Sequence, residues 1–113
     1  MRLPAPKESA VQKSILRYLT LRGALPVRVN SGAAKADDRF VRFNGSPGCS
    51  DILACYRGRF LALEVKRDGK GKPTDLQSSF IGEVVRAGGV ALVVWEVGQV
   101  ARLLDEIDES QDD

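Results

Sequence analysis

Residues 51–66, DILACYRGRFLALEVK, predict two β-strands joined by a tight turn at Arg57-Gly58. If that turn is a two-residue hairpin loop, the pairing places Asp51 directly opposite Glu64. Like charges that face each other on a sheet repel, so such a pair is most stable with a cation between its members. Hard divalent cations prefer oxygen ligands. The stretch therefore predicts a metal site at the end of the hairpin away from its turn.

Both faces of this hairpin carry mostly apolar side chains in the predicted register. Strands of this kind lie in the centre of a sheet that is covered on both sides. Carboxylates buried at one end would be costly unless they find partners or become protonated. Lys66 lies two residues after Glu64 and therefore on the same face. We expect a single cleft that holds Asp51, Glu64 and Lys66.

Hydrophobic periodicity and turn residues predict the elements on either side of the hairpin. Thr74 and Gln77 have capping-box spacing at the start of a helix, and Trp95 and Phe80 are expected to be core residues. The predicted order is α-β-β-β-β-α-β-α, an α/β domain with a central mixed β-sheet flanked by helices. The other predicted elements are helices at 7–21, 75–87 and 98–107, strands at 26–29, 39–43 and 90–95, and a polar loop at 30–38.

Length and charge suggest how the chain is organised. At 113 residues with 43% hydrophobic content, it is long enough for one core. We expect one domain over 1–104 and a partly disordered acidic tail over 105–113, which holds six of the 15 acidic residues. The preceding residues carry all 17 basic side chains against nine acidic ones. This excess suits a polyanionic partner, although a solvated basic surface explains it equally well.

Residue types and patterns that the chain lacks exclude several kinds of catalytic site and of protein. The chain has no histidine, which excludes histidine general bases and Ser-His-Asp or Cys-His nucleophilic machinery. Cys49 and Cys55 form no CxxC pair, so zinc and a disulfide framework are poorly supported. No apolar run approaches the ~18 residues of a membrane span, and the N-terminus lacks a signal-peptide pattern. We expect a cytoplasmic protein with no membrane partner.

Several short motifs occur in a characteristic order. The segment 48–52, GCSDI, is followed by 64–66, EVK, and then by Gln77 in the next predicted helix, while Glu8 lies on the first helix. This arrangement resembles the PD-(D/E)XK nuclease superfamily, which has the restriction-endonuclease-like fold, and within it the VRR-NUC domain, the virus-type replication-repair nuclease. The resemblance covers nearly the whole chain. Ser50 stands where the superfamily name has proline, at a position that shapes the turn and coordinates nothing.

The resemblance implies roles for the residues of the cleft. Asp51, Glu64, the backbone carbonyl of Val65 and Glu8 would bind Mg²⁺ or Mn²⁺. Lys66 would orient the attacking water or stabilise charge on the phosphorane, and a salt bridge to either acid is compatible with this role.

Two of the implied roles have structural alternatives, and the DNA contacts rest on loop positions. Gln77 would point toward the active site as a catalytic residue, although the capping box explains it without catalysis. Glu8 is also favoured by the helix dipole alone. Basic or polar loop residues would contact DNA, although such residues are more often only solvated. These candidates are Asn30, Ser31, Lys35, Arg39, Lys70 and Lys72.

The implied activity is metal-dependent endonucleolytic cleavage of DNA. The family suggests a phage-type homodimer that cuts branched DNA such as Holliday junctions in repair or recombination, with a metal ion and no small-molecule cofactor. One alternative is a catalytically silent nucleic-acid-binding module, which would have no use for all three of Asp51, Glu64 and Lys66. Another is a restriction-type endonuclease, which is disfavoured because so short a chain leaves little room for a recognition domain.

Overall fold

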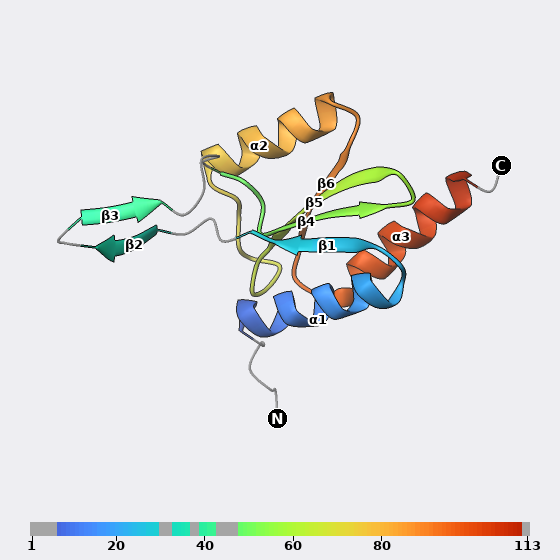
Figure 1. Cartoon of the computed structure of the whole chain (residues 1–113), viewed down its shortest axis with the longest axis horizontal. Helices are drawn as coiled ribbons and strands as arrows, with labels where there is room; N and C mark the ends of the chain where they lie inside the picture. The colour runs from blue at the N-terminus through green and yellow to red at the C-terminus, as the bar shows by residue number, and fades with distance from the viewer. Residues whose placement is uncertain (1–6, 30–32, 37–38, 43–47, 112–113) are drawn as a thin grey trace.

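The structure is a computed structural model that describes residues 7–29, 33–36, 39–42 and 48–111. Its helices and strands follow one another as the sequence predicts, with one additional strand within the predicted loop at 30–38 (Figure 1). The elements are α1 (Glu8–Leu21), β1 (Leu25–Arg28), β2 (Ala33–Ala36), β3 (Arg39–Arg42), β4 (Ile52–Tyr56), β5 (Arg59–Val65), α2 (Asp75–Arg86), β6 (Val90–Val94) and α3 (Val97–Gln111).

The central sheet has four strands in the order β1-β4-β5-β6. The β5 and β6 strands are parallel and the other neighbours are antiparallel, so the predicted mixed sheet flanked by helices is confirmed. The β2 and β3 strands pair only with each other and form a separate ribbon (Figure 1). The loop prediction was therefore wrong for Ala33–Ala36, whose small residues gave no strand signal and whose pairing depends on β3.

The β4–β5 hairpin has the predicted two-residue turn. Tyr56 pairs with Arg59 and Ile52 with Leu63, which is the register inferred from the sequence. Arg57 has a φ of 50° and Gly58 a φ of 82°. Positive φ at both central residues is the signature of a type I′ turn, whose twist matches that of the strands. The register therefore carries the acidic end of β5 to the position predicted for it.

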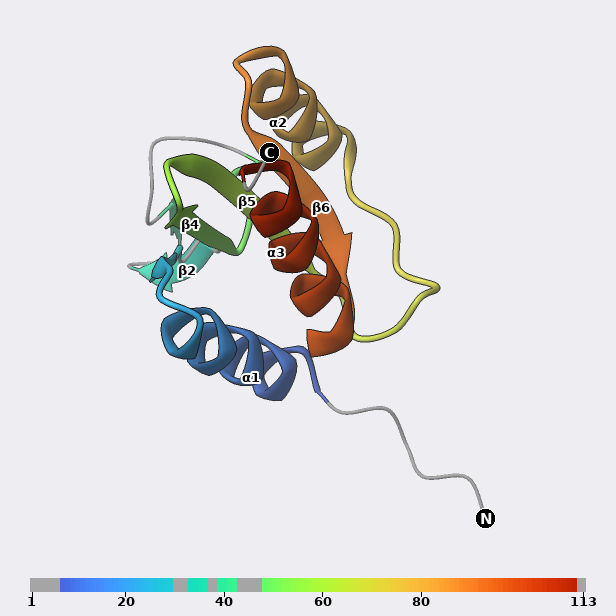
Figure 2. The same cartoon turned by 90° about the vertical axis from the view of Figure 1, so that its right-hand side faces the viewer.

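Helices cover the two faces of the sheet unequally. Helices α1 and α3 contact each other and pack with the face that carries Ile52, Leu63 and Val65, whereas α2 lies on the opposite face beside β5 and β6 (Figures 1 and 2). The α2 face is buried at Glu64 but open near the hairpin turn, where Phe60 is 46% exposed. The expectation that both faces are covered was therefore only partly correct, because α2 packs mainly against β5 and β6.

The acidic C-terminal segment is part of α3, which continues past 104 to Gln111. Asp108 accepts hydrogen bonds from Tyr56 Oη at 2.7 Å, Arg57 Nη1 at 2.9 Å and Arg22 Nη2 at 3.0 Å. Asp105 also pairs with Arg22. The sequence predicted a helix that ends near Ile107 because hydrophobic periodicity stops there, and it could not reveal basic partners that are distant along the chain. Within the described residues, no helix is both long and apolar enough to cross a membrane.

Candidate active site

The candidate site lies at the end of the β4–β5 hairpin away from its turn. The backbone N–H of Val29 donates to the carbonyl of Asp51 at 2.8 Å, which ties the residue before β4 to the end of β1. The N–H of Val65 donates to Asp51 Oδ2 at 2.7 Å. The Asp51 carboxylate is therefore held against the end of β5, beside Glu64, as the pairing arithmetic predicted.

Glu64 is the central buried charge of the site. Its side chain is 2% exposed. Oε1 accepts a hydrogen bond from Gln77 Nε2 at 2.9 Å and lies 3.8 Å from Lys66 Nζ. Oε2 is buried and has no hydrogen-bond partner among the described residues. Since buried polar atoms are normally partnered, this oxygen marks a position where a ligand is expected.

Gln77 connects the start of α2 to the site. Its Oε1 accepts from the N–H of Thr74 at 2.8 Å, and its own N–H donates to Thr74 Oγ1 at 3.2 Å, which completes the predicted capping box. The same Oε1 accepts from Lys66 Nζ at 3.3 Å, while Nε2 donates to Glu64. The two sequence interpretations of Gln77 are therefore compatible, because one amide caps the helix and also orients two charged side chains.

A glycine in the turn before β4 allows α2 to lie close to the hairpin. Gly48 has a φ of 82°, and a Cβ at this position would lie 2.3 Å from the carbonyl oxygen of Leu76. The turn before Asp51 can thus contact the first turn of α2 only with glycine at position 48. Ser50, which replaces the superfamily's proline, is fully buried. Its Oγ also has no hydrogen-bond partner within the described part of the chain.

The site is electrostatically unfavourable for its own carboxylates. Burial raises the pKa of Glu64 to about 8, and the adjacent carboxylate of Asp51 contributes further. The charge of Glu8 acts in the same direction, and Lys66 opposes it. Burial followed by the charge of Glu64 also raises the pKa of Cys49. The site therefore lacks positive charge, which a cation would supply.

These residues fit a hard divalent cation. Two adjacent carboxylates, one of them with an unpartnered buried oxygen, form an oxygen donor set of the kind that Mg²⁺ and Mn²⁺ prefer. Glu8 is exposed in the first turn of α1, and its charge acts on Glu64. Among the residues with described positions, no three Asp, Glu or Cys side chains surround one point. The contribution of Glu8 as a ligand stays a prediction.

The predicted DNA-contact residues are spread over several segments. Lys70 and Lys72 are exposed in the loop between β5 and α2. Lys35 lies in β2 and Arg39 in β3, on the ribbon outside the central sheet. Asn30 and Ser31 lie outside the described residues.

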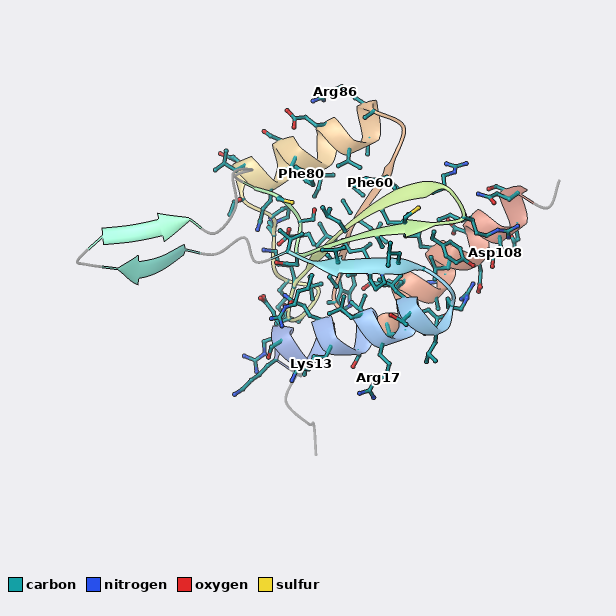
Figure 3. All side chains as sticks on the ribbon, viewed as in Figure 1. Lys13, Arg17, Phe60, Phe80, Arg86 and Asp108 are labelled. Carbon is teal, nitrogen blue, oxygen red and sulfur yellow. The ribbon has the colours of Figure 1, made fainter. Side chains whose placement is uncertain are left out.

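The two aromatic residues predicted for the core differ in how far the structure buries them. Phe80 is half-buried and points from α2 toward the sheet (Figure 3). Trp95 is 40% exposed, so its assignment to the core was wrong. The apolar run 90–95 suggested a wholly buried strand, but β6 ends at Val94 and leaves the indole at the sheet's end.

A mixed sheet with a D…E-x-K arrangement at its strand ends, and with a glutamine supplied by the next helix, is consistent with a PD-(D/E)XK-like fold. A solved structure described as a VRR_NUC domain is similar to this chain, with a TM-score of 0.68 and 26% sequence identity. The similarity covers 89% of this chain and 97% of that one. This structural similarity supports the VRR-NUC assignment that the motifs predicted. No family model and no curated protein sequence matches it.

Proposed function

We propose that this protein is a divalent-metal-dependent DNA endonuclease. The observation that carries the proposal is the unpartnered, buried Oε2 of Glu64, next to Asp51 and two residues before Lys66. A domain that only bound DNA would gain nothing from burying a carboxylate whose pKa is so strongly raised. VRR-NUC domains are nucleases, which supports a phosphodiesterase activity.

Each residue of the site has a separate role in this proposal. Asp51, Glu64, the Val65 carbonyl and Glu8 would hold Mg²⁺ or Mn²⁺, which when bound supplies an acidified water and neutralises phosphate charge. The Lys66 ammonium lies at the edge of the donor set, where it can orient a water or stabilise charge on the scissile phosphate. Gln77 fixes both Glu64 and Lys66. By analogy with the superfamily, the products carry a 5′-phosphate and a 3′-hydroxyl.

The proposed substrate is branched DNA, such as a four-way junction. Lys70 and Lys72 in the loop after β5 would contact phosphates, as would Lys35 and Arg39 on the β2–β3 ribbon. This ribbon extends beyond the end of the central sheet (Figure 1). Two basic segments in separate parts of the fold suit a substrate with more than one duplex arm.

We further propose a homodimer, in which two sites could cut two strands. The support is an exposed apolar face of the sheet near the hairpin turn. This face contains a hollow of about 280 Å³. Contiguous apolar surface of this kind commonly marks an interface. The side chains that line the hollow belong to Leu25, Val27, Leu53, Ala54, Cys55 and Phe60.

Cleavage of matched linear duplex, flap and four-way-junction DNA, each with Mg²⁺, Mn²⁺ or EDTA, tests the activity. We expect metal-dependent cutting that is fastest on branched DNA. Glu64→Ala and Lys66→Ala should each lower the rate at least ~100-fold, because each removes a charge from the reacting centre. Glu83→Ala, which removes an exposed glutamate of α2, is the matched control and should cut normally.

Two results would contradict the nuclease proposal. The first is an absence of metal-dependent cutting on every substrate, which would leave a silent binding module. The second is undiminished cutting by both site variants. Cutting of one linear sequence without regard to branching would instead indicate a restriction-type endonuclease.

A further inference from the structure

A hollow of about 210 Å³ lies where α1 meets the end of β6. Trp95, the chain's one tryptophan, lines it with 40% of its surface exposed. None of the roles proposed above uses this indole. The other lining residues are Ala10, Val11 and Ser14 from α1, and Glu96 and Val97 at the start of α3.

The indole is held in position from two sides. The backbone N–H groups of Trp95 and Glu96 both donate to Gln99 Oε1, at 2.7 Å and 3.1 Å, which fixes the entry into α3. Gly69 packs against the six-membered ring, since a Cβ at this position would lie 3.5 Å from it. An aromatic ring that is already ordered loses little conformational freedom when it binds a ligand.

One loop connects the residues of the hollow with those of the candidate active site. The N–H of Lys66 donates to the carbonyl of Val94, directly before Trp95, at 2.8 Å. Gly71 packs against the aliphatic stem of Lys66, and Gly69 packs against the indole. The segment 67–73 therefore contacts both the active-site lysine and Trp95, and it carries basic side chains that can reach phosphates.

The hollow is lined by hydrogen-bonding groups, and the helix α1 that lines it also carries basic side chains. Lys13 and Arg17 lie on the same stripe of α1 as Ala10 and Ser14, at helical spacings of three and four residues. Both basic side chains point outward from α1 (Figure 3). Small residues on α1 leave room for a planar ring, and the Ser14 hydroxyl and the Glu96 carboxylate can meet polar base edges.

We propose that this hollow receives an unstacked nucleobase of the DNA strand next to the scissile phosphate, with Trp95 as the stacking platform. Stacking of a base on an aromatic ring tolerates any base, because every base has a π-face. A paired base must first leave its duplex, at a cost that an unpaired base does not bear. The site therefore favours flaps, forks and junctions over uninterrupted duplex. This inference rests on the proposed function, because its occupant is DNA.

Trp95 provides its own readout, since the chain's tryptophan emission comes from this residue alone. In EDTA, where no cleavage is needed, a 12-nucleotide single strand or a flap should quench this emission, and a blunt duplex should not. Trp95→Ala should weaken binding of a labelled single strand roughly 5- to 150-fold, measured by fluorescence anisotropy. Ala10→Leu fills the hollow from an exposed helix position and should weaken binding similarly. Ser9→Leu, on another side of α1, should bind normally.

Unchanged emission at saturating DNA, or equal affinities of the Ala10→Leu and Ser9→Leu proteins, would overturn the nucleobase site. The outcomes also separate this inference from the nuclease proposal. Quenching without metal-dependent cleavage would support the nucleobase site and contradict the nuclease. Metal-dependent cleavage, together with unchanged tryptophan emission and normal DNA binding by the Ala10→Leu protein, would support the nuclease and contradict the nucleobase site.

Discussion

At the residue scale, Glu64 is the buried carboxylate on which the proposed function depends. It lies on a central strand, it is 2% exposed, and it is next to another acid. Such a carboxylate is stable only when it is protonated or paired with a cation. Lys66 opposes the rise in its pKa but does not cancel it. The same feature that would make the site bind metal therefore makes the metal-free protein sensitive to pH.

The sign of this sensitivity follows from the direction of the shift. The folded state raises the pKa of Glu64 from 4.5 to about 8, so the folded protein binds this proton more tightly than the unfolded chain does. The contribution to stability is complete below pH 4.5 and is lost as the pH rises through about 8, by at most about 1.4 kcal/mol per pH unit. We expect the thermal midpoint in EDTA to fall over this range.

Two comparisons check this prediction. Mn²⁺ should restore the midpoint most strongly near pH 8, because a bound cation replaces the proton. Glu64→Gln should lose both the decline with pH and the response to Mn²⁺. If the variant declined as steeply as the wild type, another group would be responsible.

Gly48 is a second residue whose identity the structure explains. Gly48→Ala should lower the free energy of unfolding by at least ~2 kcal/mol, because it combines an unfavourable φ with a backbone clash against α2. Gly88→Ala is the matched control, since Gly88 has a φ of 97° but open space around its α-carbon. It should cost only about 1 kcal/mol. Equal losses in urea unfolding would refute the packing role of Gly48.

At the scale of the elements, the last turns of α3 act as a clamp. Asp108 accepts hydrogen bonds from Tyr56 and Arg57 at the hairpin and from Arg22 after α1, so one carboxylate joins three elements. The hydrogen bond from Tyr56, followed by that from Arg57, lowers the pKa of Asp108. The acidic segment is therefore a structural part of the domain and balances part of its basic charge.

Asp108→Asn should lower the thermal midpoint at neutral pH, because the amide weakens all three charge-assisted contacts. The difference from wild type should shrink as the pH falls through the acidic range, since the lowered pKa of Asp108 gives stability that protonation removes. Glu109→Gln, at the neighbouring exposed position, should change little. Metal binding measured by calorimetry should be unaffected, because the clamp lies at the other end of the sheet.

At the scale of the whole molecule, the uncovered part of the sheet determines how two copies could associate. Pro26 lies on β1, at the edge of the sheet. The N–H of Val29 points toward β4, so strand alternation directs position 26 to the open edge, where proline offers no donor. Association through the apolar face is therefore favoured over extension of the sheet.

Light scattering after size-exclusion chromatography should give the mass of a dimer for the wild type. Val27→Lys or Phe60→Lys should shift it to a monomer, because each places a charge on the apolar face. Leu21→Lys changes an exposed leucine that does not line this hollow and should remain dimeric. A wild-type monomer at all concentrations would contradict the homodimer proposal.

The sequence by itself determined the central hairpin, its register and the meeting of Asp51 with Glu64. These follow from local pairing, because a two-residue turn fixes every opposite position. It also determined the capping box and the resemblance to VRR-NUC domains, since both depend on short spacings. The tertiary structure alone decided the separate β2–β3 ribbon, the α3 clamp, the exposure of Trp95 and the uncovered sheet face. Each of these depends on which distant segments pack together, and hydrophobic periodicity indicates that a face is apolar without indicating what covers it.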